Sequence, residues 1–125
     1  MIFVRITLIV YWLFLTTLLL VPNPAALFGR LPGPMTPSVG VHLTFFALLG
    51  LLCGLSRIRA SFWSLILTLA VYAVAIESLQ TLFPPRTVEL RDYAENLVGI
   101  GLGMALAAAI LAWRGRKPAD RRVCD

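Results

Sequence analysis

The stretch from residue 2 to residue 21 reads IFVRITLIVYWLFLTTLLLV, and Arg5 is the single charge within it. An α-helix rises 1.5 Å per residue, so about 20 apolar residues can cross the hydrocarbon core of a bilayer. Three further apolar runs follow it along the chain. The sequence therefore predicts an all-α, polytopic membrane bundle of four transmembrane helices, over about residues 2–21, 41–56, 61–82 and 93–113.

The composition of the whole chain favours the same fold class. Of its 125 residues, 59% are hydrophobic and 14% are charged. A soluble domain is about half apolar and about a quarter charged. A chain this short leaves much of its surface exposed, so the excess of apolar residues cannot all enter one core. Membrane lipids are therefore expected to cover the remainder.

Helix-breaking and capping residues mark the expected helix ends. Proline lacks a backbone N–H and cannot continue a helix, so Pro84-Pro85 should close the third span. Ser61 and Asp92 precede the third and fourth apolar runs, and both residue types are favourable N-caps. We interpret residues 2–21 as an uncleaved helix instead of a signal peptide, because the apolar core is long and no small-x-small cleavage site follows.

The distribution of positive charge predicts the orientation. Cytoplasmic segments of membrane proteins carry an excess of Lys and Arg. With both termini in the cytoplasm, eight of the 11 basic residues lie inside and the remaining three outside. The expected arrangement is one transmembrane domain over residues 1–117 and a short basic cytoplasmic tail over 118–125. Because this tail directly follows an apolar run, contact with anionic lipid is expected and nucleic-acid binding is not.

Polar residues gather at one predicted depth of the bundle, its outer end. An ionisable group at the centre of a span costs about 2.5–3.5 kcal/mol, so such groups are functional candidates. Residues three or four apart share one face of a helix. The candidates open the second helix, end the third, follow it in the loop and open the fourth: His42, Glu77, Gln80, Arg86, Asp92 and Asn96.

Three of these residues are the predicted catalytic group. Glu77 and His42 form an expected proton-handling pair, because histidine titrates near neutral pH. Asp92 is the third catalytic candidate. Each has an alternative interpretation: an interfacial histidine, a structural salt bridge from Glu77 to Arg86, and a simple N-cap at Asp92. Together the three could also bind zinc, but no local ligand motif is present, so no metal and no cofactor are predicted.

The remaining candidates are predicted to bind substrate or to pack helices. Arg86 is expected to clamp a phosphate or carboxylate, with Gln80 and Asn96 donating hydrogen bonds. Gly99 and Gly103 form a small-xxx-small pair, which lets another helix approach closely. Charged residues such as Arg91 and Glu95 are interpreted as ordinary interfacial charges, outside the candidate site.

Taken together, these residues resemble the VanZ-like family. Its pattern is E-x-x-Q, an aromatic–Pro turn, R, and then D-x-x-x-N-x-x-G, which is matched here from Glu77 through Asp92 to Gly103. His42 is similar to the histidine that opens a helix in the family's first motif. The family often carries an Asp-Lys pair before that histidine, and this sequence has Ser38 and Val39 there.

The resemblance implies a small multi-pass protein of the bacterial cytoplasmic membrane. It associates the chain with cell-envelope processes or resistance to teicoplanin-type glycopeptides. The hypothesis is that the outer face binds or modifies an anionic lipid-linked phosphate or cell-wall precursor. The alternative is a non-enzymatic scaffold or partner-docking protein whose polar cluster is structural. Transport is disfavoured, because the polar groups gather at one depth, and the sequence leaves a homo-oligomer open.

Overall fold

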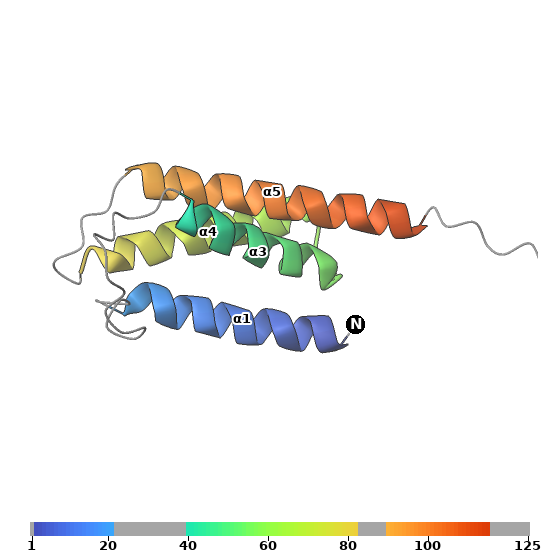
Figure 1. Cartoon of the computed structure of the whole chain (residues 1–125), viewed down its shortest axis with the longest axis horizontal. Helices are drawn as coiled ribbons and strands as arrows, with labels where there is room; N and C mark the ends of the chain where they lie inside the picture. Colours follow the sequence, from blue (N-terminus) through green and yellow to red (C-terminus); the bar gives the residue numbers. More distant parts are fainter. Residues whose placement is uncertain (1, 22–39, 83–89, 116–125) are drawn as a thin grey trace, which may run out of the picture.

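The computed structural model describes residues 2–21, 40–82 and 90–115, and all structural statements concern these ranges. Within them the chain forms four α-helices and no strand. The helices are α1 (Ile2–Leu20), α3 (Val41–Leu55), α4 (Phe62–Gln80) and α5 (Leu90–Gly115). Figure 1 shows them side by side, each running opposite to the one before it in the sequence. The prediction of an all-α bundle with four apolar helices is confirmed, whereas the orientation of the termini stays a prediction.

The helix ends agree with the sequence in one case and differ in another. Ser61 is the N-cap of α4, where its side chain accepts a hydrogen bond from the Ser64 amide at 3.1 Å. Asp92 is not an N-cap, because α5 begins at Leu90 and places Asp92 within its first turn. The N-cap assignment of Asp92 is therefore wrong. An acidic residue is favourable anywhere in the first turn, beside the positive end of the helix dipole, so it does not fix the cap.

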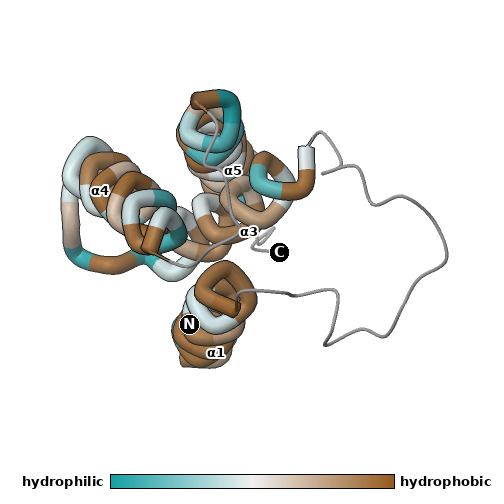
Figure 2. The backbone as a smooth tube through the Cα atoms, turned by 90° about the vertical axis from the view of Figure 1, so that its left-hand side faces the viewer, coloured by the Kyte–Doolittle hydropathy of each residue, from teal (hydrophilic) through white to brown (hydrophobic). Residues whose placement is uncertain are grey.

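The lengths and surfaces of the helices suit a membrane. Among the described residues, α1, α4 and α5 are long and apolar enough to cross one, and α3 is shorter, with 15 residues. Large apolar side chains such as Phe3, Leu67 and Val71 are exposed on the outer faces of the bundle. Figure 2 shows that hydrophobic residues predominate along α1. Lipid would cover these faces favourably.

Helices α3 and α5 make the most extensive contact in the bundle. Glycines on both helices allow the backbones to approach. A Cβ at Gly99 would lie 2.5 Å from the Leu43 carbonyl oxygen, and a Cβ at Gly103 would meet that of Ala47. Apolar residues from all four described helices fill the core around this contact. They include Leu15, Phe46, Leu49, Ala73, Ile76, Ile100 and Met104. The register between α3 and α5 is thus fixed by close backbone packing.

Helix α1 is attached to the other helices partly through polar contacts. The Tyr11 hydroxyl donates to the Phe45 carbonyl oxygen at 2.9 Å, and the hydroxyls of Thr16 and Tyr72 lie 2.8 Å apart. In the last turn of α1, the Leu19 carbonyl oxygen accepts a hydrogen bond from Gln80 Nε2 of α4. These hydrogen bonds place the end of α1 next to the end of α4.

Candidate functional site

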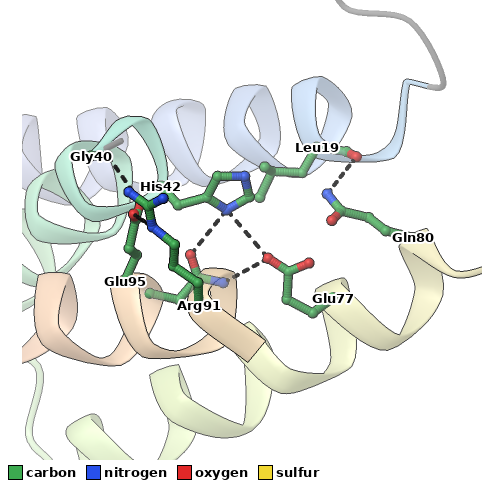
Figure 3. A network of polar contacts seen from close by, with 8 residues as sticks. Leu19, Gly40, His42, Glu77, Gln80, Arg91 and Glu95 are labelled. Carbon is green, nitrogen blue, oxygen red and sulfur yellow. Dashed lines mark hydrogen bonds and ion pairs between the residues drawn. The ribbon is translucent and has the colours of Figure 1, made fainter. Parts of the chain in front are cut away.

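His42, Glu77 and Asn96 form a closed polar triangle between α3, α4 and α5. His42 Nδ1 lies 3.3 Å from Glu77 Oε1 and 3.2 Å from Asn96 Oδ1. The Asn96 amide donates from Nδ2 to the same Glu77 oxygen at 3.0 Å. Figure 3 shows the His42 ring directed toward Glu77, with Gln80 farther along α4. Three candidates that are far apart in the sequence therefore meet at one end of the bundle.

The contacts of His42 define which ring nitrogen is available for chemistry. Both acceptor oxygens, from Glu77 and Asn96, lie at Nδ1. Nδ1 must then carry the hydrogen, and in the neutral ring Nε2 is the nitrogen with the free lone pair. The histidine side chain is 25% exposed, whereas that of Glu77 is 1% exposed. The buried carboxylate thus orients a partly accessible imidazole.

The second carboxylate oxygen of Glu77 is exceptional. Oε2 is buried and has no hydrogen-bond partner among the described residues. A buried polar atom without a partner costs about 1–3 kcal/mol, and more when it is charged. A proton on this oxygen or a bound ligand group would remove that cost. Oε2 is therefore the acceptor of the network that is left unsatisfied by the described residues.

Gln80 and Arg86, two of the predicted substrate-binding residues, are not part of the polar triangle that the structure describes. Gln80 is 3% exposed, and its Nε2 donates to the Leu19 carbonyl oxygen at 2.8 Å, so in this structure the amide joins α4 to α1. Its role in substrate binding stays a prediction. Arg86 lies outside the described residues, and so does the expected Glu77–Arg86 salt bridge.

Comparison with known families decides the relationship of this chain to other proteins. The family model described as VanZ/LLP1 matches residues 14–112. The chain belongs to this family. The matched region contains His42, Glu77 and Asn96, and it extends from the middle of α1 almost to the end of α5. No curated protein and no solved structure matches the chain.

Asp92 adds a third possible metal ligand to His42 and Glu77 in this VanZ/LLP1 family member. One ligand atom from each of His42, Glu77 and Asp92 lies within 4.8 Å of the other two. Imidazole and carboxylate are donors that zinc accepts at about 2.0–2.2 Å, so the three side chains would have to close slightly around an ion. The Glu77 oxygen that has no partner among the described residues fits such a role, because a cation would satisfy it. These three residues are the described ones that could hold a divalent metal.

Glu95 was not predicted to take part, yet it secures the start of α3 in this VanZ/LLP1 family member. Its Oε2 accepts from the Gly40 amide at 3.1 Å, and its Oε1 accepts from Arg91 Nε at 3.0 Å. Gly40 has a φ of 97°, a left-handed conformation that glycine adopts readily. The spacing of four between Arg91 and Glu95 indicates an ion pair on one helix face, but the contact with Gly40 has no sequence signal.

Proposed function

We propose that this VanZ/LLP1 family member is a multi-pass protein of the bacterial cytoplasmic membrane that acts at its outer face. Its substrate class is an anionic lipid-linked or cell-wall precursor, and its cellular role is in cell-envelope processes or teicoplanin-type resistance. The polar network lies at the end of the bundle opposite the start of α1 and the end of α5 (Figure 1). The positive-inside rule, applied to the basic residues near those helix ends, supports an outward-facing network.

The contact between His42 and the buried Glu77 carries this proposal. A carboxylate that is 1% exposed within an apolar bundle is costly, and a lock that served only stability would satisfy both of its oxygens. Here Oε1 lies 3.3 Å from the imidazole Nδ1, and Oε2 has no hydrogen-bond partner within residues 2–21, 40–82 and 90–115. This arrangement supports a site that handles a proton or a ligand group.

The chemical role of each residue follows from this geometry. His42 Nε2 accepts a proton from a hydroxyl or water that approaches from the accessible side, and Glu77 stabilises the imidazolium that forms. Asn96 holds the Glu77 carboxylate in place through its amide, at 3.0 Å. Arg86, as part of the proposal, supplies the bidentate contact to a phosphate or carboxylate of the substrate.

The test is a set of matched glutamine variants in a bacterial host that expresses the chain. We expect Glu77→Gln and His42→Gln to abolish the gain in teicoplanin resistance while membrane abundance remains equal to wild type. Glu95→Gln is the control, because the glutamine oxygen can still accept from the Gly40 amide. Wild-type resistance in the Glu77→Gln protein would overturn the proposal.

A structural role is the second candidate, and a specific observation favours it. The described hydrogen bonds of His42, Asn96 and Gln80 to other residues of the network each join different helices. If the network is a lock or a docking surface, Glu77→Gln will lower membrane abundance or thermal stability together with resistance. A stoichiometric protein partner that co-purifies in detergent would support docking.

Whether the site depends on a bound metal ion is tested by a separate measurement. The donors of His42, Glu77 and Asp92 are close enough to suggest it. Metal analysis of the purified protein, with Asp92→Asn as a comparison, would detect about one zinc per chain in the wild type alone. A metal-free wild type that remains active would assign the chemistry to His42 and Glu77 as a proton-handling pair.

A further inference from the structure

A cavity lies at the end of the bundle opposite the polar network. Its volume is about 340 Å³, within the range of ligand pockets in proteins, which is about 300–1,000 Å³. The end of α3, the following loop, the start of α4 and the second half of α5 surround it. Its lining is mainly apolar, and the residues that matter here are Phe62, Leu65, Met104, Ala108 and Leu111.

The cavity arises from unequal helix lengths. Helix α3 has 15 residues and α5 has 26, so at 1.5 Å per residue α5 is roughly 16 Å longer. Figure 1 shows α5 continuing past the end of α3. The side chains of α5 beyond this point, such as Ala108 and Leu111, are therefore not covered by α3. A partly open groove with an apolar wall is left beside α5.

Positive charge borders this groove. Arg57 and Arg59 both contribute to its lining and are exposed. Arg5 approaches the same loop, where its side chain donates to the carbonyl oxygens of Ser56 and Arg57, each at 3.3 Å. Among the described residues the three carboxylates, Glu77, Asp92 and Glu95, all lie toward the other end of the bundle. The arginines at the groove are thus not neutralised by any described acidic side chain.

We propose that this groove binds one anionic phospholipid, with its phosphate at Arg57 and Arg59 and one of its two acyl chains along α5. Basic pockets between transmembrane helices suit anionic headgroups, and each arginine near the headgroup contributes about 1 kcal/mol, or roughly fivefold in affinity. A free phosphate would leave the apolar wall uncovered, whereas an acyl chain fills it. The exposed aromatic residues Phe62 and Trp63 beside the groove match those found at membrane interfaces.

The test uses the purified full chain in detergent and counts retained lipids by native mass spectrometry. The probes are phosphatidylglycerol and phosphatidylcholine with the same acyl chains. We expect wild type to retain one phosphatidylglycerol at least about tenfold more strongly than phosphatidylcholine. The Arg57→Gln, Arg59→Gln double variant should lose most of this preference. Arg91→Gln, which removes one arginine from the opposite end, should keep it.

A second variant tests the apolar wall of the groove. It also gives an independent result if the arginine double variant misfolds. Ala108→Phe adds volume on an exposed, cavity-lining position and should lower phosphatidylglycerol retention severalfold. Equal retention of the two lipids by wild type, or unchanged retention in both the arginine and the Ala108→Phe variants, would overturn the proposal. Displacement of the lipid by an equal concentration of glycerol 3-phosphate would also overturn it, because a soluble phosphate would then suffice.

Discussion

A charged residue is buried at one end of the bundle, and charged residues are exposed at the other. At one end, Glu77 is buried and hydrogen-bonded to His42 and Asn96, which come from two other helices. At the other end, Arg57 and Arg59 are exposed beside an apolar groove. Both sets of residues lie in an apolar chain, where charge is costly. The two ends thus differ in burial. The residues around the buried Glu77 are held in fixed positions by their hydrogen bonds, whereas the exposed arginines can attract a charged ligand from outside the bundle.

The difference has an energetic consequence. Removing one partner from a buried network leaves the others unsatisfied, which costs about 1–3 kcal/mol. Removing an exposed arginine costs little stability, because water or lipid headgroups replace its contacts. Apolar substitutions at the network end, unlike the hydrogen-bonding glutamine variants of Glu77 and His42, should therefore lower stability as well as function, and substitutions at the arginine end should affect lipid binding alone.

The largest expected effect comes from the contact that supports both ends. Gly103→Val would place side-chain atoms against the Ala47 backbone and force α3 and α5 apart. We expect a loss of about 3 kcal/mol in the free energy of unfolding, typical of severe overpacking. Thermal unfolding in detergent measures it.

Gly101→Val is the matched control for this substitution. A Cβ at Gly101 meets nothing within 4 Å, although the residue lies on the same helix two positions earlier. Its melting temperature should remain near that of wild type. Equal destabilisation by the two variants would show that helix propensity, and not the contact between α3 and α5, controls stability.

A smaller effect is expected from Asn96→Leu at the network end. The substitution removes the donor to Glu77 and the acceptor of the His42 hydrogen while keeping a side chain of similar size. Glu77 then keeps only its described contact with His42, and the lost hydrogen bonds should cost about 2 kcal/mol in the free energy of unfolding. Denaturant or thermal titration in detergent would check this value. An unchanged stability would mean that the triangle is not formed in the folded protein.

The smallest effect is expected from Arg5→Gln at the arginine end. This side chain makes two long hydrogen bonds of 3.3 Å to backbone oxygens of the loop after α3, and it is largely exposed. We expect a change of about 0.5 kcal/mol or less in the free energy of unfolding. If Arg5→Gln lowered the free energy of unfolding as much as Asn96→Leu does in the same assay, the two ends would not differ in how strongly their polar residues stabilise the fold.

The sequence predicted much of this arrangement. The four apolar runs correspond to the four described helices, and Ser61 was identified correctly as a cap. The spacing of Glu77, Asp92 and Asn96 resembled the VanZ-like pattern, and the family match confirms that relationship. Hydropathy and spacing sufficed here because both are properties of residues near one another along the chain.

Other features had no such local signal. The contact of Glu95 with Gly40 and that of Gln80 with Leu19 join residues 55 and 61 positions apart. Which helix a side chain meets depends on how each helix is rotated about its axis, and hydropathy does not determine that rotation when all faces are apolar. For the same reason, the groove beside Arg57 and Arg59 could not be foreseen.

The sequence by itself thus determined that this protein is a bundle of apolar helices, to which family it belongs, and that its few polar residues lie near helix ends. The tertiary structure decided that His42, Asn96 and Glu77 meet at one carboxylate oxygen and that the basic end contains a groove. The physical reason lies in packing. Close contact at Gly99 and Gly103 fixes the rotation of α5 against α3, and that rotation brings the polar faces together.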